Sequence, residues 1–343
     1  MTQNDFRTTP SAPDAGSGTA GATTPRRGPR PVPPGVEYHR VLAGDRRRVG
    51  RGVLALALLL LGLFGFGGLV TYAGGQLDLH VFGRHSVIAG GTEFTPITHL
   101  GNVVSIALLI PWSMFLQRWL YGVRGASLHS VLSTLRPALV GRAVLILLPV
   151  WAVYLTVFTA LSPSRVSEWA TSDLLWIFAI TIVLQPLQSA GEEYGFRGLA
   201  FRVAASWGRG TRTSLVIGVA VSTLLFAVIH ASTDPWLNVY YLSLGVTWSL
   251  ITWRTGGLET SIVIHATNNT LAFLLMLVTH SDPVSGADRS SGVGSVIFLI
   301  PCTLLAIVTT VIWVRTRRAG PARTPGPGTR PAAADTPKGT MRA

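Results

Sequence analysis

Long apolar runs separated by short polar connections fill the chain from about residue 52 to residue 314. About 20 apolar residues make one transmembrane helix, so the runs predict eight spans. Four of the runs contain an internal proline, which we expect to kink a helix without ending it, because neighbouring helices can satisfy the freed carbonyl groups. The pattern predicts an all-α, polytopic membrane helix bundle. The predicted spans are about 52–74, 99–120, 138–160, 173–191, 212–231, 236–253, 258–279 and 293–314.

The two ends of the chain lack this pattern. Residues 1–50 are rich in Pro, Gly, Thr, Ala and Arg, and residues 317–343 are similar. Segments of this composition bury too little apolar surface to offset the entropy of ordering, so both are expected to be disordered tails. About fifty polar residues before the first apolar run are too many for a secretory signal, and the first run is expected to stay as an anchor. The predicted membrane-spanning domain is 51–316.

Composition supports a membrane protein and argues against nucleic-acid binding. The 343 residues are 48% hydrophobic and 13% charged. Residues 1–51 carry nine arginines and four acidic residues, and residues 315–343 carry seven basic residues and one acidic residue, so the tails hold +11 of the net charge of +13. Basic tails beside membrane spans fit contact with anionic lipid. The single cysteine, Cys302, excludes an intrachain disulfide and a cysteine-based metal cluster.

Arginines gather at alternate connections, on the same side as both tails. The other connections carry only Arg84, Arg165 and Arg289. By the positive-inside rule both termini are expected to be cytoplasmic, in the cell membrane, which agrees with an even number of spans. The arginines on the side of the tails are Arg118, Arg124, Arg136, Arg142, Arg197, Arg202, Arg209, Arg212 and Arg254.

Two adjacent carboxylates and an arginine end the fourth apolar run. Glu193 and Arg197 are four residues apart and should face each other on a helix, whereas Glu192 points about 100° away from them. Glu193 is therefore predicted to be paired and Glu192 to be available. Charges at membrane depth usually face a bundle interior or a watery cavity, so a functional site is the first interpretation and a helix end at the interface the second.

Two histidines and an amide lie in the later spans at the same four-residue step. Phe226 stacks beneath His230, and Asn269 lies one turn after His265, so each helix offers one focused polar point. A lone histidine is more often a satisfied core residue. Two histidines together with a carboxylate and an amide favour a shared site, which requires the spans to bring them to one depth.

This set of residues suits amide hydrolysis. A carboxylate partly withdrawn from water is a stronger base, so Glu192 could deprotonate water and His230 could share the proton. His265 and Asn269 could donate hydrogen bonds to the tetrahedral oxyanion. A zinc site formed by Glu192, His230 and His265 is the alternative, although Asn is a poor zinc ligand and His-Glu-x-x-His is absent. We favour catalysis without a cofactor.

The three motifs, in this order, resemble those of the CPBP family. This family comprises type II CAAX prenyl endopeptidases and bacteriocin-processing or immunity proteins. The matching positions are Glu192, Glu193 and Arg197, then Phe226 and His230, then His265 and Asn269. The resemblance covers about residues 170–280 and implies an intramembrane protease of about eight helices with the same roles for these residues, Glu193 and Arg197 positioning the helix. It implies a peptide or membrane-protein substrate, including lipidated ones.

Two other classes of function fit the same composition. Glu and His residues in helices also serve proton-coupled transporters, but the motifs occur once and no inverted repeat is present. A catalytically silent scaffold that recruits partners through its basic tails is the other possibility. Loss of function in Glu192→Gln at normal expression would separate a peptidase from a scaffold.

Overall fold

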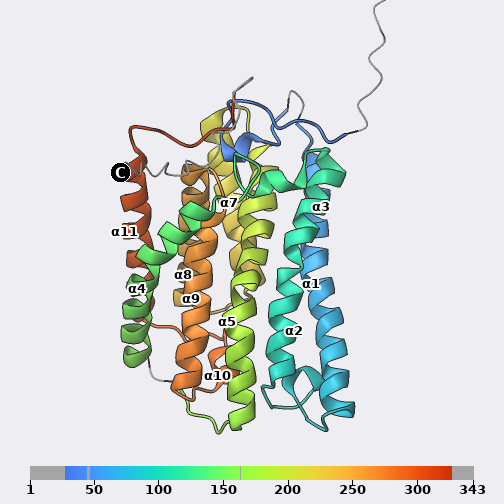
Figure 1. Ribbon diagram of the computed structural model, residues 1–343, viewed down its shortest axis with the longest axis vertical. Coiled ribbons are helices and arrows are strands. Elements are labelled where there is room, and N and C mark those ends of the chain that lie inside the picture. The colour runs from blue at the N-terminus through green and yellow to red at the C-terminus, as the bar shows by residue number, and fades with distance from the viewer. Residues whose placement is uncertain (1–27, 45–46, 163, 327–343) are drawn as a thin grey trace, which may run out of the picture.

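The computed structural model describes residues 28–44, 47–162 and 164–326, and this part of the chain is all-helical, without a β-sheet (Figure 1). The α-helices are α1 (Val49–His80), α2 (Pro96–Ala107), α3 (Leu109–Tyr121), α4 (Pro137–Leu161), α5 (Thr171–Glu193), α6 (Phe201–Ala205), α7 (Thr211–Ile229), α8 (Pro235–Thr255), α9 (Glu259–Val278), α10 (Pro283–Gly286) and α11 (Leu299–Thr316). Four 3₁₀ turns, η1 (Tyr38–Arg40), η2 (Val87–Ala89), η3 (Gly125–Leu128) and η5 (Val296–Phe298), and one π-helical segment, η4 (Tyr194–Ala200), complete the described elements.

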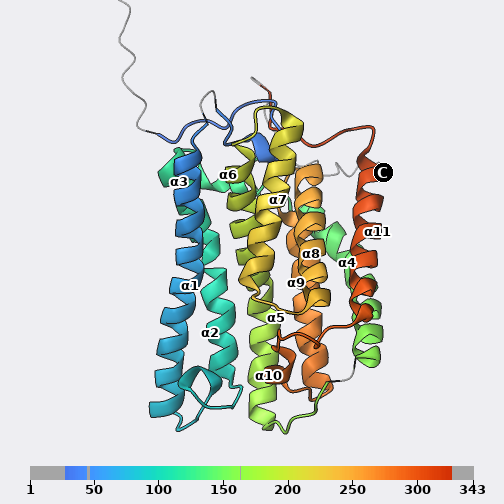
Figure 2. The same cartoon turned by 180° about the vertical axis from the view of Figure 1, so that it is seen from behind.

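Each of the eight predicted spans is helical, and seven candidate spans are long and apolar enough to cross a membrane. The sixth, α8, has 21 residues but is not among them. It carries Asn, Ser, Thr, Tyr and Trp side chains and begins at a connection that lies part-way along the bundle, not at its end (Figure 2). The count of eight is thus approximate, because a helix that starts inside the bundle needs less apolar surface.

The internal prolines do not break the count of spans, as predicted, because each of the four runs that contain them is one candidate span. Pro149, Pro186 and Pro301 lie within continuous helices. In the second span, α2 ends at Ala107 and α3 begins at Leu109. Pro111 has no N–H to donate to the carbonyl of Ala107, four residues earlier, which explains a break at this position.

Most of the apolar surface faces outward. In α1, for example, Leu61, Phe64 and Leu69 are more than half exposed. In α11 only 11% of the most apolar stretch is buried inside the protein. A soluble protein would not leave such surfaces in water, so the chain is an integral membrane protein.

The expectation of disordered tails is wrong where the tails are described. Residues 28–44 and 317–326, which we call the terminal layer, pack across one end of the bundle (Figures 1 and 2). Tyr38 is fully buried and its hydroxyl donates to the carbonyl of Leu128 at 2.6 Å. The indole of Trp253 donates to Glu37 at 2.8 Å. The rest of the predicted tails, residues 1–27, 45–46 and 327–343, lies outside the described residues.

The same end holds the connections that carry most arginines. Hydrogen bonds join Arg30 to Gly122, His39 to the carbonyl of Thr211, and Arg254 to Thr316. Both described ends of the chain therefore leave from one end of the bundle, as predicted. The opposite end is tied by Arg84, which contacts Glu93 at 3.0 Å and Asp173 at 2.8 Å.

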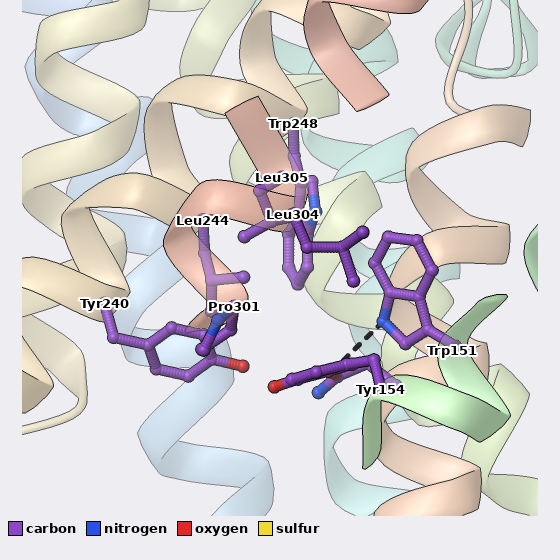
Figure 3. Close-up of a pocket in the computed structure, with 9 residues that line it drawn as sticks. Trp151, Tyr154, Tyr240, Leu244, Trp248, Pro301, Leu304 and Leu305 are labelled. Atoms are coloured by element: carbon purple, nitrogen blue, oxygen red, sulfur yellow. Dashed lines mark hydrogen bonds between the residues drawn. The ribbon is translucent and has the colours of Figure 1, made fainter. Parts of the chain in front are cut away.

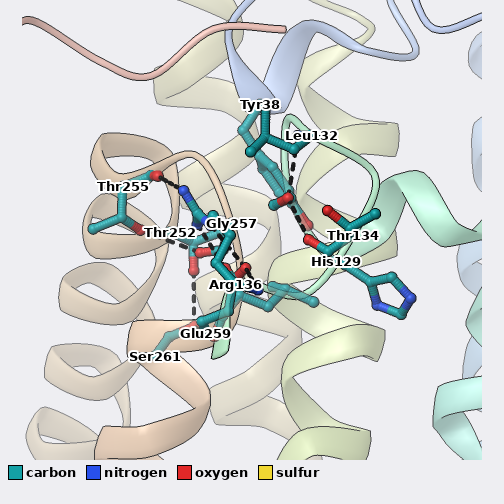
Figure 4. Close-up of polar contacts among 12 residues, drawn as sticks. Tyr38, His129, Leu132, Thr134, Arg136, Thr252, Thr255, Gly257, Glu259 and Ser261 are labelled. Carbon is teal, nitrogen blue, oxygen red and sulfur yellow. Dashed lines mark hydrogen bonds and ion pairs between the residues drawn. The ribbon is translucent and has the colours of Figure 1, made fainter. Parts of the chain in front are cut away.

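A buried ion pair fixes the start of α9 beneath the terminal layer (Figure 4). The guanidinium of Arg136 donates to both carboxylate oxygens of Glu259, at 2.8 and 2.6 Å. The same side chain donates to the carbonyl of Thr255 at 2.9 Å. The side chain of Glu259 is fully buried. Burial of a charge is tolerated here because each carboxylate oxygen has a charged donor.

Candidate functional site

Glu192 and Glu193 stand at the junction of α5 and the π-helical segment η4. Short π-helical segments inside α-helices are rare and often occur at functional sites. The residue before them, Gly191, packs against the break between α2 and α3, where a Cβ atom would collide with the carbonyl oxygen of Ile106. Only glycine permits this approach, so α5 is held against α2 directly beside Glu192.

Glu193 forms the ion pair that the sequence predicts. Its Oε1 lies 3.2 Å from Nη1 of Arg197, and both side chains are fully buried. The geometry is that of a charge contact without a hydrogen bond. The guanidinium lies over the rings of Phe226 and Trp248, at 3.9 and 4.9 Å from their centroids. The aromatic faces and Glu193 together compensate for the desolvation of Arg197.

His265 connects the two glutamates. Its Nδ1 lies 3.0 Å from Oε1 of Glu193, which makes the carboxylate the acceptor of the Nδ1 proton. Its other ring nitrogen, Nε2, lies 3.9 Å from Oε2 of Glu192. The tautomer set by Glu193 thus turns the free nitrogen of His265 toward Glu192.

Glu192 is 8% exposed and has one hydrogen-bond donor in the described part of the chain. Gln188 Nε2 donates to its Oε1 at 2.5 Å, while Oε2 is buried without a partner. Buried carboxylate oxygens are normally satisfied, so an unpartnered one needs an explanation. The separation of 3.9 Å from His265 is too long for a direct hydrogen bond and short enough for one water molecule to contact both groups.

Asn269 joins this group through Gln188. Its Nδ2 lies 3.3 Å from Oε1 of Gln188, whose other end holds Glu192. The structure therefore brings four of the predicted residues together: Glu192, Glu193, His265 and Asn269. The predicted ion pair adds Arg197 to them.

His230 lies beside this group without a hydrogen bond to it among the described residues. Its Nδ1 donates to the carbonyl of Phe226 at 2.7 Å, which leaves Nε2 free. Its ring centroid lies 4.1 Å from that of Tyr241 and 4.6 Å from that of Phe226. The stacking of Phe226 against His230 is as predicted.

An aromatic wall backs the site on the side of α4, α8 and α11 (Figure 3). The ring of Trp248 packs 4.4 Å from that of His265. Behind Trp248 lies a cavity of about 10 Å³, room for about one water molecule. Its other lining residues include Trp151, Tyr154 and Tyr240. The wall separates the polar group from the lipid-facing side of these helices.

The nitrogen atoms of His230 and His265 bear on the alternative of a zinc site. His230 and His265 each use Nδ1 for another partner and keep Nε2 available, as metal-binding histidines do. Within the described residues, however, no three His, Cys, Asp or Glu side chains are close enough together to hold a metal ion.

The sequence interpretation missed two residues of the site. Gln188 is a polar side chain in an apolar run, four residues before Glu192, and this spacing was a usable signal. Trp248 carries no such signal, because an aromatic residue in an apolar helix usually indicates core or lipid contact.

Comparison with known proteins supports the motif assignment. Residues 171–271 match the family described as type II CAAX prenyl endopeptidase Rce1-like. The uncharacterized protein YyaK of Bacillus subtilis (strain 168) is 33% identical over 129 residues, which cover 36% of this chain and 41% of that protein. The chain thus spans about two fifths of this curated relative. No solved structure matches the chain. All three motifs fall inside the matched segment, so the resemblance predicted from them is confirmed by the Rce1-like match over residues 171–271.

Proposed function

We propose that this protein is an intramembrane endopeptidase that hydrolyses a peptide bond with water activated by Glu192. One observation carries the proposal: a buried, unpartnered carboxylate oxygen of Glu192 faces the free nitrogen of His265 at 3.9 Å. A water molecule between them would have two acceptors for its protons, which is what a general base requires. The Rce1-like match of this segment supports the same class of reaction.

Each neighbouring residue takes one role in this reaction. Glu192 removes a proton from water, and the resulting hydroxide attacks the carbonyl carbon of the scissile bond. His230, whose Nε2 is free, shares that proton and returns it to the leaving amine. Asn269 donates to the oxyanion of the tetrahedral intermediate, and Nε2 of His265 accepts the second O–H of the attacking water. Asn269 Nδ2 has two N–H groups and uses one for Gln188, so the second is available.

The substrate in this proposal is a peptide or a membrane protein, with lipidated ones included. The site lies among membrane-spanning helices behind an aromatic wall. The test is cleavage of a prenylated peptide and of the same peptide without the lipid by protein purified in detergent. Glu192→Gln is the matched control, since it keeps the size of the side chain and loses the base. Cleavage by wild type and by Glu192→Gln at equal rates would refute the proposal.

The proposed enzyme needs no metal. A strong chelator is expected to leave the activity of the purified protein unchanged, because the proposed base is a carboxylate and Asn269 is a poor zinc ligand. Zinc bound at one equivalent, lost together with activity in both His230→Ala and His265→Ala, would overturn this part of the proposal.

The proposed location is the cell membrane, with both tails in the cytoplasm. The arginine-rich connections and both described termini share one end of the bundle. A reporter that works only in the cytoplasm should function when fused after Arg318. A reporter that works only outside should function when inserted near Asp288. The opposite pattern would reverse the topology.

A further inference from the structure

Among the residues that the structure describes, one side chain, that of Gln188, donates a hydrogen bond to the carboxylate of Glu192. The bond from Gln188 Nε2 to Glu192 Oε1 is 2.5 Å long, and both residues are buried. Without it, the three side-chain torsions of Glu192 would be free to turn Oε2 away from His265. Gln188 belongs to none of the three sequence motifs.

The contacts of the amide oxygen of Gln188 agree with an orientation in which its NH₂ group faces Glu192. Its Oε1 lies within reach of three donors: Gln185 Nε2 at 2.8 Å, Ser189 Oγ at 3.3 Å and Asn269 Nδ2 at 3.3 Å. In the reversed orientation, the NH₂ group of Gln188 would face the NH₂ groups of Gln185 and Asn269. The amide oxygen of Gln188 would then lie against the carboxylate of Glu192. An ionised carboxylate can only accept, so Glu192 itself requires Gln188 to present Nε2, and the three groups around Oε1 fit this orientation.

A series of side-chain hydrogen bonds runs from Trp151, in the aromatic wall, to Gln188. Trp151 Nε1 donates to Asn268 Oδ1, Asn268 Nδ2 donates to Asn269 Oδ1, and Asn269 donates to Gln188, each at 3.3 Å. Each donor in this series of hydrogen bonds lies on the side away from Glu192, and the last acceptor is the carboxylate of Glu192. Hydrogen bonds aligned in this way polarise one another, so the last donor, on Gln188, is the strongest.

We propose that Gln188 is a positioning residue, which fixes the carboxylate of Glu192 so that Oε2 faces His265 and the reacting water. The catalytic part of this inference rests on the proposed peptidase function. The positional part, that Gln188 is what holds the carboxylate, is independent of any activity. Misplacement of a general base by about 1 Å can cost about 100-fold in rate.

The test is Gln188→Leu, with Gln188→Met as a second variant of similar volume and Gln185→Leu as the matched control. Gln185 lies on the same buried face of α5 and contacts Gln188 but not Glu192. For Gln188→Leu we expect kcat to fall about 10- to 100-fold with KM changed less than about twofold. For Gln185→Leu we expect kcat within about threefold of wild type, since Ser189 and Asn269 still orient the amide.

An infrared measurement separates the two proposals. The difference between wild type and Glu192→Gln isolates the carboxylate stretching bands of Glu192. These bands should shift when Gln188 is replaced and stay in place in Gln185→Leu. If no peptide is cleaved by wild type, the proposed function fails and the infrared bands alone decide the role of Gln188. If wild type cleaves peptide while Gln188→Leu and Gln188→Met keep both kcat and the bands, the inference about Gln188 is overturned and the peptidase stands.

Discussion

Two buried glutamates of this protein have opposite surroundings. Glu259, beneath the terminal layer, receives three hydrogen bonds from Arg136, one from its backbone and two from its guanidinium (Figure 4). Glu192, at the candidate site, receives one hydrogen bond from a neutral amide, and its second oxygen has no partner. Both side chains are almost completely withdrawn from solvent.

The number and charge of the hydrogen-bond donors distinguish a carboxylate that stabilises the fold from one that can take part in a reaction. A carboxylate with a charged donor on each oxygen is held in a fixed geometry, and most of its lone pairs are already used. A carboxylate with an unpartnered oxygen keeps lone pairs that can accept a proton from a reacting water molecule. Glu193 lies between these cases, because it is paired with Arg197 and also orients His265.

The largest effect is expected for Glu193→Gln. This change leaves the guanidinium of Arg197 buried without an opposite charge and should lower the free energy of unfolding by about 3–5 kcal/mol. Activity should fall as well, because His265 loses the charged acceptor of its Nδ1 proton. Denaturant titration in mixed micelles measures the first effect and peptide cleavage the second.

A double variant provides the control for Glu193. Adding Arg197→Met removes the unpaired charge and keeps an unbranched chain against Phe226 and Trp248. Stability should return to within about 2 kcal/mol of wild type, since a buried pair replaced by apolar groups costs little. Activity should not return. If Glu193→Gln alone were as stable as wild type, the ion pair of Glu193 and Arg197 would not stabilise the fold.

Next in size is the effect of Asn269→Ala on turnover. Loss of an oxyanion donor should lower kcat about 100-fold, equivalent to about 2.7 kcal/mol, with little change in KM. Asn268→Ala is the neighbouring control, since its contacts are to Trp151 and Asn269 and not to Glu192. Equal kcat in wild type and Asn269→Ala would make Asn269 a bystander.

The helices and the pairing inside the first motif could be predicted because each depends on local spacing. Apolar runs of about 20 residues gave the helices, and a four-residue step gave the contact between Glu193 and Arg197. The depth at which α7 ends was less accessible, because nothing in an apolar run marks a helix that stops inside the bundle. For that reason α8 was counted as an ordinary span.

The terminal layer could not be predicted from composition. Pro, Gly and Arg dominate residues 28–44, and its order depends on a few anchors that find ready-made sites on the bundle. Tyr38 is the clearest: its ring lies under the guanidinium of Arg202 at 3.8 Å, and its hydroxyl reaches Leu128. These contacts join residues far apart in sequence, so no local pattern announces them. The π-helical segment η4 is likewise set by packing.

A smaller effect is expected for Glu259→Gln, and it should fall on stability alone. Arg136 keeps some contact with solvent, its side chain being 22% exposed, so the free energy of unfolding should drop by about 1.5–3 kcal/mol. Activity per folded molecule should match wild type, in contrast to Glu192→Gln. If Glu259→Gln lost turnover while keeping the stability of wild type, Glu259 would take part in the reaction and the distinction between the two glutamates would be wrong.

The smallest effect is expected at a third kind of carboxylate, Asp234, which binds only backbone. Its Oδ1 accepts from the N–H groups of Trp236 and Leu237 at the start of α8, and its Oδ2 accepts from Gly292 and Gly294.

These four donors hold the pKa of Asp234 below its ordinary value, the N–H of Leu237 contributing most. A lowered pKa means that the stabilisation is present above the ordinary pKa of an aspartate and is lost as pH falls through the lowered value. Asp234→Asn should lower Tm by about 2–4 °C at neutral pH and by progressively less toward acid, where the wild-type carboxyl is also protonated. Asp288→Asn is the control, since Asp288 accepts from one backbone N–H, that of Ser290, in an exposed loop, and it should shift Tm less. A difference between Asp234→Asn and wild type that grows toward acid would have the wrong sign and would show that Asp234 is not held in its ionised form by the start of α8.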